Sequence, residues 1–300
     1  MRKVLLSLAV LASSVASAQL LNISSVEKVN LPAGVDAAQV ALSHDGSFAV
    51  VNGAGGLQKV DLATGKAVKI GGVATLSGVE ISEDGSTVVY KQPVFKNKLR
   101  YTTLKSVNLK DGKEGTIVDA SRNLQGFALA KNSVGAVDNG KFTAKNLDGA
   151  AATFIVTVAS IKNGALMVSV NGVNNNISPQ GTTGQSYLWP SVSPDGKKVL
   201  YYLVGQGAFV CNLDGSNPVS VGVMRAPKWY NNEIVLGMQD EDNGEIVTAS
   251  KLVAASVDGK VMQDLTQVSS MAMYPAVAGN GSKVSFVTPA GELFVMNVNK

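Results

Sequence analysis

The stretch Ser193-Pro194-Asp195-Gly196-Lys197-Lys198-Val199-Leu200-Tyr201-Tyr202-Leu203 contains a turn motif followed directly by an apolar and aromatic run. An Asp-Gly pair favours a tight hairpin turn, because both of its central positions can adopt positive φ. Nineteen residues after Gly196, a second turn motif, Asn212-Leu213-Asp214-Gly215, ends a further apolar run. We therefore predict that the first turn opens a strand and that the second joins a third strand to a fourth.

Both motifs recur along the chain, and the interval of 19 residues returns between Gly46 and Gly65. The first motif is repeated at Ser43-His44-Asp45-Gly46-Ser47, Ser82-Glu83-Asp84-Gly85-Ser86 and Ala278-Gly279-Asn280-Gly281-Ser282. Strands are predicted after these turns at 48–51, 87–90, 198–203 and 283–287. The second motif is repeated at Asp61-Leu62-Ala63-Thr64-Gly65, Asn108-Leu109-Lys110-Asp111-Gly112, Asn146-Leu147-Asp148-Gly149 and Ser256-Val257-Asp258-Gly259. The two motifs therefore belong to one repeating unit.

The spacing of the turns gives the number of units. Asp45 and Asp84 are 39 residues apart, and Asp84 and Asp195 are 111 apart, which is three steps of 37. Weaker copies of the first motif fill the intervals at Asn132-Ser133, Asn163-Gly164 and Asn231-Asn232. This predicts seven units, at about 35–72, 73–122, 123–156, 157–185, 186–222, 223–267 and 268–300. A unit near 40 residues with four short strands is typical of a β-propeller blade. Six blades are the alternative, if the short third and fourth units merge.

The last unit has sequence for only three strands. A propeller joins its first and last blades, since open sheet edges would otherwise remain. The segment Leu21 to Leu31 precedes the first unit and alternates apolar residues, so it can supply the missing strand. We predict an all-β fold, with residues 19–300 forming a single propeller closed by an N-terminal strand.

Residues 1–18 have the pattern of a cleaved signal peptide. The cationic start Met1-Arg2-Lys3 precedes an apolar stretch that ends in Ala16-Ser17-Ala18, a small-x-small cleavage site. We expect export to the periplasm or the medium, with no integral membrane segment after cleavage. The single cysteine, Cys211, excludes an intrachain disulfide and lies in an apolar run, so it is predicted to be buried.

The two motifs of unit five also carry a family resemblance. Ser193-Pro194-Asp195-Gly196-Lys197-Lys198-Val199-Leu200 and the later Asn212-Leu213-Asp214-Gly215-Ser216-Asn217-Pro218 resemble the PD40, or WD40-like, repeat of TolB-like β-propellers. The match is specific in unit five, fair in units one, two and seven, and weak in the others. The resemblance implies an exported propeller protein.

The residue types argue against several kinds of chemistry. One histidine, His44, lies inside a repeated turn, and no Gly-x-Ser-x-Gly motif is present, so a serine hydrolase is not expected. One His and one Cys do not suit a transition-metal centre. The acidic run Asp240-Glu241-Asp242-Asn243-Gly244-Glu245 leaves calcium as an alternative, although it does not match the twelve-residue calcium loop. We expect no cofactor and no catalytic residues. A formal net charge of +4 without a basic block gives no support to nucleic-acid binding.

Recognition of a partner is the function that these observations favour. Loops between second and third strands, and segments that enter each first strand, are expected to share one face of a propeller. A long loop expected in unit two brings Lys96, Lys98, Arg100 and Tyr101 to this face. Aromatic residues and Arg are common anchors of interfaces. The candidate binding residues are Lys96, Arg100, Tyr101, Tyr187, Trp189, Arg225, Trp229, Tyr230, Asp240, Asp242 and Tyr274. We expect a monomeric, non-enzymatic scaffold for a protein or peptide of the cell envelope. The alternative is a propeller that binds a glycan or small ligand in its channel, with hydrolase or lyase activity.

Overall fold

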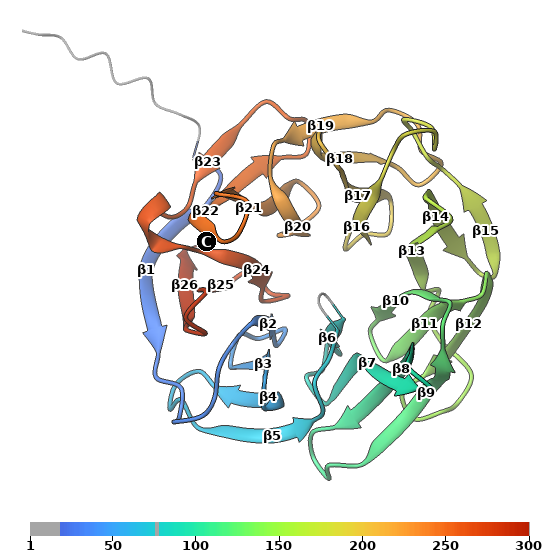
Figure 1. Ribbon diagram of the computed structural model, residues 1–300, viewed down its shortest axis with the longest axis horizontal. Helices are drawn as coiled ribbons and strands as arrows, with labels where there is room; N and C mark the ends of the chain where they lie inside the picture. Colours follow the sequence, from blue (N-terminus) through green and yellow to red (C-terminus); the bar gives the residue numbers. More distant parts are fainter. Residues whose placement is uncertain (1–18, 76–77, 300) are drawn as a thin grey trace, which may run out of the picture.

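The computed structural model describes residues 19–75 and 78–299, and these form a ring of β-sheets (Figure 1), the arrangement in which propeller blades surround a central channel. The predicted signal peptide lies outside the described residues. Seven antiparallel sheets follow one another around the ring. The prediction of a seven-bladed propeller is therefore confirmed, and the six-bladed alternative is wrong, because units three and four form separate sheets.

Five of the described sheets have four strands. Blade 1 contains β2 (Gln39–Leu42), β3 (Phe48–Gly53), β4 (Gly56–Asp61) and β5 (Ala67–Gly71), and blade 2 contains β6 (Val79–Ile81), β7 (Thr87–Lys96), β8 (Leu99–Asn108) and β9 (Glu114–Ser121). Blade 5 contains β16 (Tyr187–Val192), β17 (Lys198–Leu203), β18 (Gly207–Asn212) and β19 (Val219–Gly222). Blade 6 contains β20 (Arg225–Trp229), β21 (Ile234–Asp242), β22 (Val247–Ser256) and β23 (Met262–Asp264). Blade 7 contains β24 (Met273–Val277), β25 (Lys283–Val287), β26 (Leu293–Asn299) and the N-terminal β1 (Asn22–Val29). A short 3-10 helix, η1 (Val268–Ser270), precedes β24.

The two short units have three strands each, which differs from the four that the repeat predicts. Blade 3 contains β10 (Leu124–Ala130), β11 (Ser133–Asp138) and β12 (Lys141–Asn146), and blade 4 contains β13 (Thr157–Lys162), β14 (Ala165–Val170) and β15 (Val173–Asn176). In blade 3 the place of the outer strand is reduced to one bridge, between Lys145 and Ala151. In blade 4 the outermost strand, β15, is exposed along its length.

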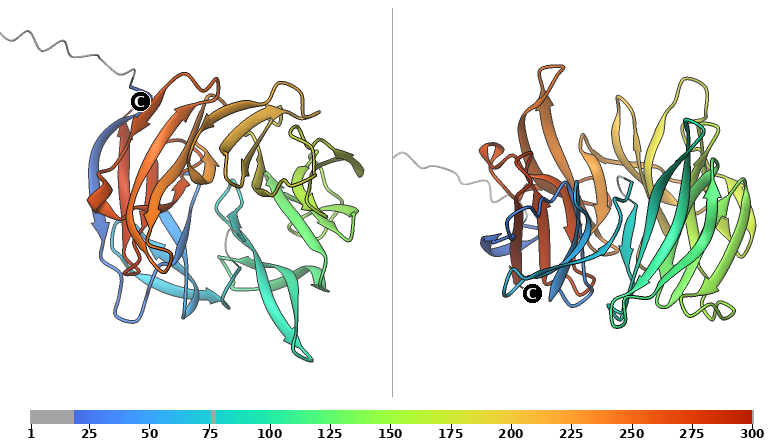
Figure 2. Two further views of the ribbon diagram at one scale, coloured as in Figure 1. Left: turned by 45° about the horizontal axis from the view of Figure 1, so that its top comes forward. Right: turned by 60° about the horizontal axis from the view of Figure 1, so that its bottom comes forward.

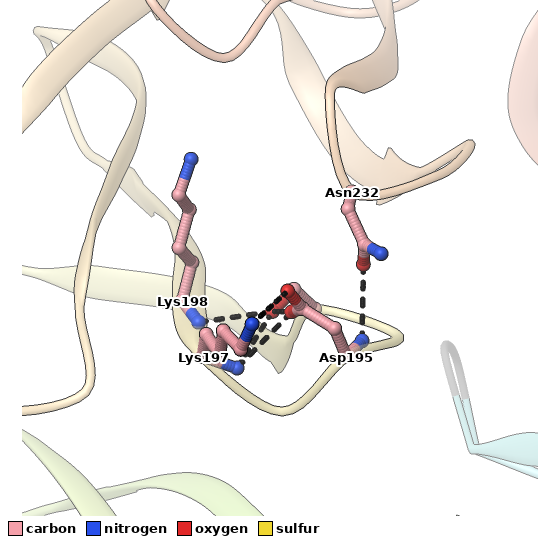
Figure 3. Close-up of polar contacts among 5 residues, drawn as sticks. Asp195, Lys197, Lys198 and Asn232 are labelled. Carbon is pink, nitrogen blue, oxygen red and sulfur yellow. Dashed lines mark hydrogen bonds and ion pairs between the residues drawn. The ribbon is translucent and has the colours of Figure 1, made fainter.

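The repeated Ser-x-Asp-Gly turn is held by its own side chains. The Ser193 hydroxyl donates to Asp195 at 2.6 Å and accepts the Lys198 amide at 2.9 Å, where β17 begins. Ser43 and Ser82 repeat both contacts in blades 1 and 2. Figure 3 shows that the Asp195 amide also donates to the Asn232 side chain of the next blade, at 3.0 Å. The turn therefore starts a strand and connects neighbouring blades.

The core lies between the sheets. Leu200 and Val210 of blade 5 pack with Val235 and Val253 of blade 6 in one buried cluster. The second strand of each blade supplies much of this core because both of its faces meet other blades, so it has an apolar run instead of strict alternation. Cys211 is 2% exposed, and burial raises the pKa of its thiol to about 12. It is a packing residue, as expected.

The N-terminal strand closes the ring. Strand β1 pairs antiparallel with β26, from Asn22 opposite Asn299 to Val29 opposite Leu293. The chain just before β1 is also held by blade 6, since the Gln263 side-chain oxygen accepts the amides of Leu20 and Leu21 at 2.7 and 2.8 Å. The predicted closure is confirmed.

Candidate functional site: the loop face and the channel

One side of the ring carries the turns between second and third strands, and two of these hairpins are unusually long. Strands β7 and β8 have ten residues each, and β21 and β22 have nine and ten. Both hairpins extend beyond the neighbouring blades on the same side of the ring (Figure 2, right). We call this side the loop face.

The β7–β8 hairpin corrects one expectation, because Lys96, Arg100 and Tyr101 lie on strands and not in a long loop. The strands stay paired to Lys96 opposite Leu99, and the turn Asn97-Lys98 has φ of 49° and 64°. These positive angles belong to a tight hairpin turn. The Lys96 ammonium lies 5.8 Å from the centre of the Tyr101 ring.

The acidic run of blade 6 is likewise the end of a hairpin. The side chain of Asp240 is only 2% exposed and accepts a hydrogen bond from Arg225 at 2.6 Å. Asp242 accepts the Gly244 amide at 2.9 Å, within its own turn. Among residues 19–75 and 78–299, no three His, Cys, Asp or Glu side chains gather as a metal site would require.

The segments that enter the first strands form a repeated bulge in blades 5, 6 and 7. Trp189, Ala226 and Tyr274 have φ of 48°, 46° and 51°, and each precedes a proline. The pairing register with the second strand shifts at all three places. A bulge bends a strand and redirects its side chains, so this motif sets how the three inner strands enter the channel.

The aromatic candidates largely connect parts of the fold. The Tyr187 hydroxyl donates to the Gly181 carbonyl at 2.8 Å, and the Trp189 ring lies 5.2 Å from that of Tyr202. Trp229 donates to the Ser191 carbonyl of blade 5 at 3.4 Å, and Tyr230 to the Gly281 carbonyl of blade 7 at 2.7 Å. Tyr274 is the candidate that also lines an open groove.

This groove has a volume of about 560 Å³ and lies on the loop face between blades 6, 7 and 1. Its lining is mainly apolar, and one wall is the β21–β22 hairpin, where Ile246 is 66% exposed. Asp36 adds a carboxylate. The lining residues are Asp36, Ala37, Ala38, Ile246, Val247, Met273, Tyr274, Val287, Thr288, Pro289, Ala290 and Gly291. Sequence reasoning found only Tyr274 of these, because the groove is made by three distant parts of the chain.

The channel contains a charge cluster that the sequence prediction missed. Glu80 of β6 and Lys228 of β20 come from inner strands, and Lys91 of β7 lies 5.4 Å from the Phe127 ring centre. Burial raises the pKa of Glu80, and the positive charge of Lys228 offsets part of this rise. Burial also lowers the pKa values of Lys91 and Lys228. A cavity of about 30 Å³ adjoins Lys228, close to the volume of one water molecule. The sequence contains one sign of this cluster, because Glu80 is a charged residue between the apolar residues Val79 and Ile81 of a short strand.

Helices long and apolar enough to cross a bilayer do not occur in the described part of the chain.

Known proteins were compared with the chain by sequence and by structure. No family model and no curated protein sequence matches. A chain of the mitotic checkpoint complex matches in structure with a TM-score of 0.61 and 10% identity, over 100% of this chain and 99% of that one. Oligogalacturonate lyase from Vibrio parahaemolyticus matches with a TM-score of 0.56 and 13% identity, over 92% and 97%. TolB from Acinetobacter baumannii matches with a TM-score of 0.50 and 15% identity, over 75% of this chain and 53% of that chain. The protein thus shares the β-propeller fold of TolB and of these other propellers.

Proposed function

We propose that this protein is an exported propeller that binds a protein or peptide partner of the cell envelope in the groove between blades 6, 7 and 1. The observation that carries the proposal is the groove itself, with its volume of about 560 Å³ and its mainly apolar lining. Exposed apolar surface of this kind in a folded protein is typical of a binding site. Export rests on the sequence pattern of residues 1–18.

The groove suits an extended peptide that brings apolar side chains. Ile246 presents an exposed apolar side chain on one wall, and Pro289 and Ala290 form part of the other. Asp36 at the same groove can accept a hydrogen bond or attract a cation of the ligand. Because Tyr274 lies in the bulge of β24, its backbone conformation is set by the fold before the ligand arrives. A groove formed in advance lowers the entropic cost of binding.

A peptide library displayed on phage and selected against residues 19–300 tests this function. Selected peptides should bind in solution, and Ile246→Glu should weaken them at least tenfold, because it places a charge on the apolar wall. Val68→Glu is the matched control, since Val68 is 54% exposed on the outer strand β5, away from the groove. Peptides that bind the Ile246→Glu variant as tightly as the parent protein would refute the proposed site.

The channel supports a second candidate, the binding of a small anionic ligand. Two ammonium groups, Lys91 and Lys228, face the single carboxylate of Glu80, so an anion would balance the charge. Lys228→Gln should then abolish binding of a small inorganic anion such as phosphate, measured by calorimetry, while peptide binding in the groove is unchanged. Equal heats of binding for Lys228→Gln and the parent protein would exclude the channel.

A further inference from the structure

The end of the β7–β8 hairpin exposes large apolar side chains that contact no core. Phe95 is 70% exposed and Leu99 is 43% exposed, one on each side of the turn. Exposing an aromatic ring to water is unfavourable in proportion to its apolar area. The fold does not need these residues, since the hairpin extends beyond the packed part of blade 2. They are therefore available to a surface outside the molecule.

Cations surround these two side chains. Lys96, Lys98 and Arg100 are all exposed, and within the described residues no ion pair joins any of them to an acidic side chain. By contrast, Arg225, at the start of β20 below the opposite long hairpin, is paired with Asp240 at 2.6 Å. We call Phe95, Lys96, Asn97, Lys98, Leu99 and Arg100 the basic tip. It combines three unpaired cations with two exposed apolar residues.

We propose that the basic tip docks on the surface of an anionic lipid bilayer. Phe95 and Leu99 enter the interface between headgroups and acyl chains, and Lys96, Lys98 and Arg100 contact the phosphates. Aromatic and aliphatic residues beside cations have this preference for the membrane interface. A single narrow turn of six residues is too small for a stable protein interface, which buries about 800 Å² on each partner. A bilayer needs no concave site and accepts such a tip.

The second long hairpin fixes how the ring would lie on the bilayer. Glu241, Asp242 and Glu245 are exposed near its end, on the same face but on another side of the ring from the basic tip (Figure 2). An anionic surface repels these carboxylates while it attracts the tip. The ring is therefore tilted, with blade 2 against the lipid and the groove beside blade 6 turned to the solvent.

Flotation with lipid vesicles tests this inference. Residues 19–300 should float with vesicles of 30% phosphatidylglycerol in phosphatidylcholine, and not with phosphatidylcholine alone. Near an anionic surface each cation contributes about fivefold to the affinity, so Lys96→Gln, Lys98→Gln and Arg100→Gln together should weaken binding by roughly a hundredfold. Phe95→Ser with Leu99→Ser should weaken it by about tenfold. Val173→Ser, at an exposed residue of the outer strand β15 in blade 4, should have no effect.

A second measurement separates insertion from simple charge attraction. A nitroxide attached to Asn97→Cys should become inaccessible to a water-soluble relaxation agent when vesicles are added. The label is specific because Cys211 is buried. All altered residues are exposed, and equal melting temperatures would confirm that the variants fold. Equal flotation with neutral and anionic vesicles, or none with either, would overturn the proposal. Recovery of an acidic protein by the tip without vesicle binding would also overturn it.

Discussion

At the scale of single residues, the Ser-x-Asp turn couples strand initiation to a carboxylate. Hydrogen bonds from the Ser43 hydroxyl, and from the amide and hydroxyl of Ser47, lower the pKa of Asp45 from 3.8 to about 2. Because the folded-state pKa lies below the value of the unfolded chain, this carboxylate stabilises the fold above about pH 4. The stabilisation is lost as the pH falls through the folded-state value.

Replacing Ser43 tests this coupling. Ser43 is 1% exposed, and Ser43→Ala removes the bond to Asp45 and the acceptor for the Phe48 amide. We expect the free energy of unfolding to fall by about 1–3 kcal/mol at pH 7. The difference from the parent protein should narrow at pH 2, where Asp45 is protonated in about half of the folded molecules. Urea unfolding of both proteins at pH 7 and pH 2 measures this difference in free energy of unfolding. An equal difference at both pH values would contradict the coupling.

The two repeated turns of blade 5 require glycine for different physical reasons. Gly196 and Gly215 have φ of +74° and +84°, but a Cβ at Gly196 meets no atom within 4 Å, whereas one at Gly215 overlaps the Ile177 carbonyl oxygen. Gly196→Ala should cost about 1–2 kcal/mol through backbone strain alone. Gly215→Ala should cost at least about 2 kcal/mol more, because the backbone must move. Thermal unfolding of the two variants measures these costs, and equal losses of stability would show that the contact with Ile177 is unimportant.

At the scale of elements, the strands that follow the repeated turns were predictable, and the length of the long hairpins was not. The strands predicted at 198–203 and 283–287 appear as β17 and β25 with the same bounds. Lys96, Arg100 and Tyr101 were expected in a loop, but they lie on β7 and β8. Pro93 is tolerated in β7 because the ladder of β6 with β7 ends at Tyr90 and the last backbone bonds on that side are those of Lys91 with Gly78 and Thr75. The groove and the channel charges could not be located from the sequence, since they depend on contacts between parts of the chain that are far apart in sequence.

The bulges before proline in blades 5, 6 and 7 hold non-glycine residues at positive φ, and this strain can be tested at Ala226. Ala226 is 5% exposed and holds φ at 46°, a conformation that glycine adopts without strain. Ala226→Gly should therefore change the free energy of unfolding by less than about 1 kcal/mol, since relief of strain offsets the lost methyl group. Ala208→Gly, at a fully buried residue within β18, should cost about 1–2 kcal/mol. Chemical unfolding distinguishes the two, and a larger loss at Ala226 would contradict the strained bulge.

At the scale of the whole molecule, the ring depends on strand β1. Deleting residues 19–31 exposes the edge of β26 and the apolar residues beneath it. We expect a fall in melting temperature of more than about 10 °C or aggregation, because an open edge pairs with other chains. A synthetic peptide of residues 20–31 should restore part of the stability by binding at the vacated edge.

The matched control is Lys28→Ala. It removes only the exposed ion pair of Lys28 with Glu292 at 2.6 Å, which should be worth less than about 1 kcal/mol. Calorimetry of the deletion, the peptide complex and the control provides the comparison. A deletion variant that melts at the parent temperature would show that blade 7 is stable with three strands.

The pairing of Asn22 with Asn299 has a consequence for how the protein is made. The ribosome synthesises β1 first and β26 last, so these two strands cannot pair and close the ring until translation reaches the end of β26. Contacts between residues so far apart in sequence form slowly. The ring of a nascent chain thus stays open until β26 has been made, and a chain that ends before Leu293 lacks the partner of β1. Such prematurely terminated products keep an unpaired strand edge, which is open to pairing with other chains.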